Sequence, residues 1–150
     1  VLGEYFGEDT APFVASGTVE GRLAPSTEVD WFRLKAVETS SAVLSCNPVQ
    51  GIPDDPLRTR LRASGGSSEY PVRFCVCWSK ETDRCSETDR VCQTSSGSVV
   101  TFAPIMETVC PVMPFIPKDV GFVDVEVMHP PNVQAVGACE EWTVEWELWD

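Results

Sequence analysis

The sequence has little of what would point to an enzyme, a nucleic-acid-binding protein or a membrane protein. It contains one histidine, His129, which precedes two prolines, and it has no serine motif of the nucleophile-elbow type. Its 11 basic residues stand against 23 acidic ones, and the resulting formal net charge of −12 repels nucleic-acid backbones. Its apolar runs are shorter than the roughly 20 residues that a membrane-spanning helix needs. We therefore expect no catalytic activity, no nucleic-acid partner and no membrane span.

The N-terminal region lacks both a leader sequence and a regular period. Residues 1–13 contain no basic segment followed by an apolar one, as expected if a signal peptide has been removed or if the chain is a piece of a longer protein. Residues 1–15 mix glycine and proline with acidic and aromatic residues, which predicts an arm that acts either as a tether or as a cover for a sheet edge. Residues 16–150 are then expected to form one β-sandwich domain with a two-layer core.

The clearest pattern in the chain is the alternation within residues 21–37. Phe32 and Leu34 alternate with Trp31 and Arg33, as is typical of a half-buried strand, and a Pro/Ser/Asp turn precedes them. The same analysis gives eight strands and no amphipathic helix. They are expected at residues 18–23, 31–37, 41–46, 57–63, 71–78, 98–103, 121–128 and 141–149. The prediction is an all-β fold, a jelly-roll or Greek-key β-sandwich of about eight antiparallel strands with disulfide-stapled loops.

Seven cysteines favour disulfides, and so a secreted or cell-surface protein. The odd number leaves at least one thiol unpaired or bonded to another chain. Cys75 and Cys77 point the same way on one predicted strand, so their partners must lie elsewhere, and we expect Cys85 and Cys92 to staple a polar loop back onto that strand. The alternative for these four is a zinc site, although the gap between the first two is shorter than structural zinc sites usually have. The other disulfide candidates are Cys46, Cys110 and Cys139.

Two tryptophans and three arginines are candidate binding residues. Trp31 and Trp149 fall on the polar faces of their predicted strands, where an indole suits stacking on a sugar ring or burial against a second subunit, unless it packs beneath the arm or a loop. Arg58, Arg60 and Arg62 form a basic stripe. This stripe either meets carboxylates on a neighbouring strand or binds an anion such as a sulfated glycan.

Calcium is a second metal ion for which the sequence offers ligands. Asp54 and Asp55 lie in a proline-rich loop, and carboxylate and carbonyl oxygens are the ligands that calcium prefers. Their spacing matches no EF-hand loop. No other cofactor is expected.

Parts of the chain resemble the bacterial pre-peptidase C-terminal (PPC) domain family. The similar features are a strand ending in Gly-Arg-Leu at residues 21–23, the turn, and Asp-Trp-Phe-Arg-Leu at residues 30–34. Residues 122–128 and 142–148 are similar to the closing pair of strands of that family. The resemblance covers about half of the chain, and the cysteine-rich middle is an insertion that the family does not usually carry. It implies a secreted jelly roll, with calcium at sandwich loops in some members.

These observations predict a non-catalytic extracellular module that binds a polymer, a cell surface or its parent enzyme. The alternative is a structural subunit that self-assembles into an extracellular fibre or surface layer. The N-terminal arm and an unpaired cysteine would supply the contacts between copies in that case.

Overall fold

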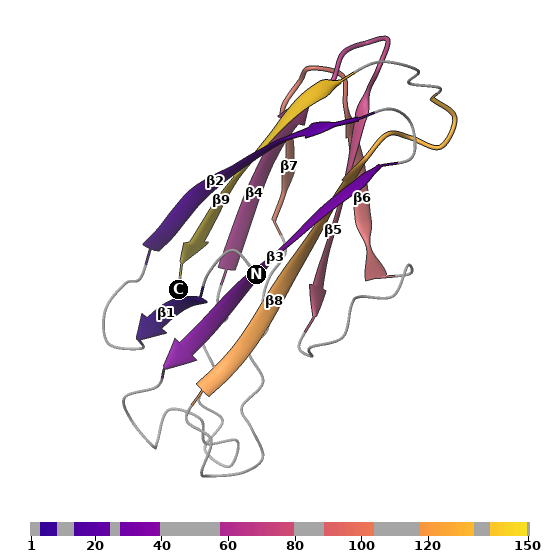
Figure 1. Cartoon of the computed structure of the whole chain (residues 1–150). Coiled ribbons are helices and arrows are strands. Elements are labelled where there is room, and N and C mark those ends of the chain that lie inside the picture. Colours follow the sequence, from indigo (N-terminus) through magenta and orange to yellow (C-terminus); the bar gives the residue numbers. More distant parts are fainter. Residues whose placement is uncertain are drawn as a thin grey trace.

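The computed structural model describes residues 4–8, 14–24, 28–39, 58–79, 89–103, 118–133 and 139–149. Within these ranges the chain forms nine strands and no α-helix (Figure 1). Nothing in this part of the chain is helical over a length, or with an apolarity, that would span a membrane. The strands are β1 (Glu4–Glu8), β2 (Val14–Leu23), β3 (Val29–Thr39), β4 (Arg58–Gly65), β5 (Val72–Ser79), β6 (Val91–Ser95), β7 (Val100–Phe102), β8 (Lys118–Met128) and β9 (Glu140–Trp149).

The strands form a sandwich of two sheets. The five-stranded sheet has the order β1-β3-β8-β5-β6 and the four-stranded sheet the order β2-β9-β4-β7. Except at the β5–β6 pair, each strand lies in the opposite sheet from the strand before it, so neighbours within a sheet come from distant parts of the sequence (Figure 1). Strands β2 to β9 pair only antiparallel and have the strand order of a jelly roll. The predicted fold class is confirmed.

Strand β1 is an addition to this jelly roll. It pairs in parallel with β3, with Glu4 opposite Lys35 and Glu8 opposite Thr39. An edge strand exposes unpaired backbone groups, and a covering segment satisfies them. The described part of the predicted arm therefore covers one edge of the five-stranded sheet by adding a strand to it.

Two other elements differ from expectation. Strand β2 begins at Val14, four residues before the predicted strand and inside the predicted arm. The segment around Cys92 was expected to be a polar loop, and this is wrong, because residues 91–95 form β6 and pair with β5. These residues are mostly polar and show no apolar alternation, so the sequence did not predict the strand. Backbone pairing and a disulfide hold it in the sheet. The strand predicted at residues 41–46 lies outside the described ranges.

The hydrophobic core fills the space between the sheets, and its residues follow the predicted alternation. On β3, Phe32 and Leu34 are buried, and on β9 every second residue from Trp142 onward is buried. Fully burying a side chain of this size contributes about 2 kcal/mol relative to leaving it exposed. The buried cluster comprises Leu23, Phe32, Leu34, Leu61, Ala63, Val72, Phe74, Val76, Phe102, Val123, Val125, Val127, Trp142, Val144, Trp146 and Leu148.

Two glycines on β2 make room for the large indoles of β9. Gly17 lies opposite Trp146 and Gly21 opposite Trp142 in the antiparallel pair. A Cβ atom on Gly17 would come within 2.5 Å of the Trp146 ring, so the ring occupies the place that a side chain on β2 would need. Trp142 also stacks on Phe32 with ring centroids 6.2 Å apart, and its Nε1 donates to Asp30 Oδ2 at 3.1 Å. The Asp-Trp-Phe segment at the start of β3 is thus anchored to the last strand of the chain.

Candidate functional site

The outer face of the five-stranded sheet carries a row of residues that crosses four strands. Outward-facing residues alternate with core residues along each strand, and the register aligns them across the sheet. Trp31 on β3 lies opposite Glu126 on β8, which lies opposite Cys75 on β5, which lies opposite Cys92 on β6. Neighbouring strands are about 4.8 Å apart, so the row extends over about 14 Å.

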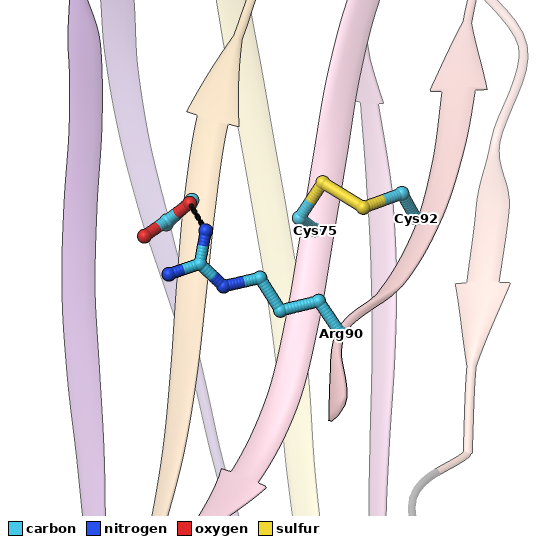
Figure 2. Close-up of a disulfide and its surroundings, with 4 residues drawn as sticks. Cys75, Arg90 and Cys92 are labelled. Atoms are coloured by element: carbon cyan, nitrogen blue, oxygen red, sulfur yellow. Dashed lines mark hydrogen bonds and ion pairs between the residues drawn. A yellow bond between two sulfur atoms is a disulfide. The ribbon is translucent and has the colours of Figure 1, made fainter. Parts of the chain in front are cut away.

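A disulfide and an ion pair link the strands that carry this row. Cys75 and Cys92 are joined by a disulfide, which fixes β6 against β5. Arg90 comes just before β6, and its side chain reaches over β5 to Glu126, where Nη1 donates to Oε2 at 2.7 Å (Figure 2). The Arg90 and Glu126 side chains are 23% and 18% exposed, so the pair is partly shielded from water but reachable. The disulfide therefore also helps to position the charged pair beside Trp31.

A second charged pair lies in the next row and is buried. Arg33 donates through Nε and Nη2 to the two carboxylate oxygens of Asp124, at 2.6 and 2.7 Å. The Arg33 guanidinium also lies 4.8 Å from the centroid of the Phe122 ring. Arg33 and Asp124 lie on the outer face of the sheet, as the alternation predicts, but both are buried there. Two opposite charges that bond to each other in this bidentate way can be buried together.

Two apolar side chains remain exposed beside this braced surface. Trp31 is 50% exposed and Val29, two residues before it on the same face, is 49% exposed. Next to Trp31 lies a small cavity of about 10 Å³, whose lining includes Arg90, Asp124 and Glu126. A cavity of that size holds about one water molecule or one hydroxyl group. We name the surface formed by Val29, Trp31, Arg90 and Glu126 the Trp31 face.

A larger cavity lies where the two sheets end side by side. It has a volume of about 300 Å³, and its lining includes Trp78 on β5, Val91 and Gln93 on β6, and Phe102 on β7. Gln93 Nε2 donates to the carbonyl oxygen of Thr101 at 2.9 Å, which links the edge strands of the two sheets. This cavity is separate from the Trp31 face, because none of Val29, Trp31, Arg90 and Glu126 is in its lining.

The arginine stripe and Trp149 lie on the outer face of the other sheet. Arg58, Arg60 and Arg62 are exposed, as predicted from the alternation of β4. Arg60 Nη1 is 3.5 Å from Glu147 Oε2, and its guanidinium lies 5.3 Å from the centroid of the Trp149 ring. Trp149 is therefore half-buried beside Arg60. The structure places Trp149 and the stripe together and separates both from Trp31 by the full thickness of the sandwich.

The disulfide prediction is confirmed for one pair of the described cysteines, Cys75 and Cys92. Cys77 is also disulfide-bonded. Cys139 is exposed and has a free thiol. The candidates Cys46, Cys85 and Cys110 lie outside the described residues.

The calcium candidates Asp54 and Asp55 also lie outside the described residues. Within the described ranges, no group of three or more His, Cys, Asp or Glu side chains is arranged to hold a metal ion. Asp30, a further carboxylate near a loop, accepts a hydrogen bond from Trp142. The calcium site stays a prediction.

The single histidine packs into the end of the sandwich. His129 is 6% exposed, and its Nδ1 lies 3.0 Å from the carbonyl oxygen of Pro71. Tyr70, the residue before Pro71, hydrogen-bonds to the Glu69 carboxylate. That bond and the negative charge of Glu69 raise the pKa of Tyr70 above its usual value of 10.0. Neither residue belongs to the Trp31 face.

Sequence reasoning identified Trp31 but missed Arg90 and Glu126. Alternation places Glu126 only on the outward face of its strand, and Arg90 belongs to the segment predicted to be a polar loop. The signal available in the sequence was the two-residue period of a strand, because residues two apart lie on the same face. This period places Glu126 on the same face as Asp124, and Arg90 on the same side as Cys92. Their pairing needed the order β8-β5-β6, which alternation alone does not give.

Comparisons with known proteins give no family. No family model matches the chain, and no curated protein matches it. A solved structure of Desmodium yellow mottle tymovirus is similar at 12% sequence identity with a TM-score of 0.35, covering 94% of this chain and 89% of that chain. The fold assignment rests on the strand order and register of the protein itself.

Proposed function

We propose that the chain is a PPC-like, non-catalytic module that works outside the cytoplasm and binds an extracellular partner through the Trp31 face. Disulfides support the location, because they persist in oxidising compartments. The jelly roll supports a binding role less strongly, since this architecture serves many functions. The proposal therefore depends on the surface rather than on the fold.

The half-exposed indole of Trp31 on a braced sheet face carries the proposal. Leaving a tryptophan half in water forgoes part of the favourable free energy of burial that its ring would otherwise contribute. Here the neighbouring strands are tied together by the Cys75–Cys92 disulfide and by the Arg90–Glu126 pair. A rigid surface loses little conformational entropy on binding, so an exposed aromatic ring on it suits recognition.

The test is binding of the labelled, oxidised protein to a panel of insoluble extracellular polymers and intact bacterial cells. Trp31→Ala is expected to lower retention, because it removes the exposed ring without touching the core. Trp149→Ala is the matched control, since it removes a tryptophan from the outer face of the opposite sheet. Equal retention of wild type and Trp31→Ala on every surface would contradict the proposal.

A second candidate function is self-assembly into a fibre or layer. The observation that favours it is β1, which adds to a sheet edge through backbone pairing, a geometry that also works between copies. Cys139, exposed at the start of β9, offers a covalent link. Light scattering before and after reduction tests this function. Large species that disappear on deletion of residues 1–13 or with Cys139→Ser would favour it over the binding module.

A further inference from the structure

We infer that the Trp31 face binds a neutral polysaccharide, with a sugar ring stacked on Trp31 and sugar hydroxyls bonded to Arg90 and Glu126. This inference rests on the proposed function and names its ligand class. It depends on three features of the face: an exposed aromatic ring, a reachable ion pair beside it, and a cavity of hydroxyl size between them.

The first feature is the match between the indole and one side of a sugar ring. A pyranose ring presents a face of C–H groups, which packs on the electron-rich face of an aromatic ring, while its hydroxyls point outward around the rim. Trp31 is 50% exposed, and Val29 extends the apolar surface along the same strand face. Residues two apart on a strand are about 6.8 Å apart, so together they offer a platform about as long as one sugar unit.

The second feature is the polar rim beside this platform. Glu126 lies directly opposite Trp31 across the β3–β8 pair, and Arg90 bonds to Glu126 at 2.7 Å. A sugar hydroxyl both donates and accepts hydrogen bonds, so a single hydroxyl can accept from the guanidinium and donate to the carboxylate. The cavity of about 10 Å³ beside Trp31 has both of these groups in its lining, and it matches one hydroxyl in size.

The charges around this platform favour a neutral ligand. The two ion pairs nearest Trp31, Arg90–Glu126 and Arg33–Asp124, are each neutral overall. A charged ligand gains little net attraction from a pair whose two charges cancel. Lys35 and Arg73 lie further along the face and would attract an anion, but the chain as a whole carries a net charge of −12, which repels polyanions. Neutral hydroxyls, which leave both pairs intact, fit this surface better.

The experiment is affinity gel electrophoresis of the native, oxidised protein with soluble polysaccharides in the gel. The neutral probes are hydroxyethylcellulose, laminarin, arabinoxylan, galactomannan and dextran, and the anionic probes are alginate and heparin. Titration of any polysaccharide that retards the protein gives its affinity. The variants are Trp31→Ala and Glu126→Gln, with Trp149→Ala as the control on the opposite face. Circular dichroism verifies that each variant is folded.

We expect at least one neutral polysaccharide to retard the wild type, with an affinity that changes by less than about twofold between about 0.05 and 0.5 M salt. Trp31→Ala should weaken that affinity by about tenfold or more, the factor that corresponds to loss of one good stacking contact. Glu126→Gln should weaken it by about threefold or more, because the rim loses an ionised acceptor. Trp149→Ala should bind as the wild type does.

Three results would overturn the inference. Retardation by none of the neutral probes would reject the ligand class; the proposed function would then survive only if Trp31→Ala still lowers retention on the polymer and cell panel. Binding only to alginate or heparin, lost at high salt, would assign an anionic ligand instead. Neutral binding that Trp149→Ala abolishes and Trp31→Ala does not would move the site to the arginine-bearing face.

Discussion

Replacing Asp124 with asparagine removes one charge from a pair that is almost wholly buried. The Arg33 and Asp124 side chains are 10% and 11% exposed, and they share hydrogen bonds of 2.6 and 2.7 Å. Asparagine keeps the shape of the side chain and one acceptor oxygen. The Arg33 guanidinium would then remain buried against Phe122 without the negative charge of Asp124.

The variant loses stability because water does not reach this position to solvate the charge that remains. Removing one partner of a buried ion pair typically destabilises a protein by about 3 to 5 kcal/mol, because the remaining charge stays desolvated. Since asparagine retains one acceptor, we expect Asp124→Asn to lower the free energy of unfolding by about 3 kcal/mol. With a denaturant dependence of about 2 kcal/mol per molar urea, the unfolding midpoint should fall by about 1.5 M. That is a large share of the roughly 5 to 15 kcal/mol by which a domain is stable.

Urea unfolding of the oxidised protein, followed by tryptophan fluorescence, measures this change. Glu145→Gln, an acidic residue exposed on the other sheet, is the control and should change stability by less than about 0.5 kcal/mol. The double variant Arg33→Met, Asp124→Leu should recover most of the loss, because an apolar pair of similar size replaces the ion pair. The reasoning is refuted if Asp124→Asn is as stable as the control, or if the double variant is less stable than Asp124→Asn.

Three further predictions concern the sandwich itself. Gly17→Ala should lower the free energy of unfolding by about 1 to 3 kcal/mol, because the new Cβ would displace the Trp146 ring. The control Ser16→Ala, on the outer face of the same strand, should leave the stability nearly unchanged, and thermal unfolding of the two variants measures the difference. Trp142→Phe should cost about 1 kcal/mol or more, since Asp30 loses its indole donor; a urea midpoint equal to wild type would contradict it. Removing the disulfide that joins β5 to β6, whose ends are 17 residues apart, with the double variant Cys75→Ser, Cys92→Ser should cost about 3 kcal/mol by the loop-entropy model, measured as the difference between the unfolding curves of the oxidised wild type and the oxidised variant.

The alternation of side chains was enough to predict most of the fold. It assigned the core faces of β3, β8 and β9 correctly, because these strands bury one face against the other sheet and their inward residues are apolar. It did not predict β1, since a strand added at an edge is held by backbone pairing and needs no apolar period. It also missed β6, whose residues are mostly polar and whose place in the sheet depends on pairing with β5.

The candidate site was harder to predict than the fold. Alternation identifies the face that is apolar, but it does not tell whether the opposite face stays in water, and Arg33 and Asp124 are buried on that opposite face. The sequence indicated Trp31 as an outward aromatic residue. It gave no means of placing Arg90 beside Glu126, because the two residues are 36 positions apart and meet across an intervening strand.

The pairing of β2 with β9 has a consequence for how the chain folds. Val14 lies opposite Trp149, so one inner strand of the four-stranded sheet is the last of the described strands along the sequence, and its edge partner is among the first. Closing so long a loop lowers the entropy of the chain before any favourable contact has formed. Folds dominated by such distant pairings therefore reach the native state slowly, in about milliseconds to seconds. Before β9 has been made, β2 and β4 lack the strand to which both of them pair, so the four-stranded sheet cannot form. The sandwich therefore cannot be completed before β9 has been made, and the slow pairing of β2 with β9 leaves time for cysteines to mispair before β5 and β6 are held in register.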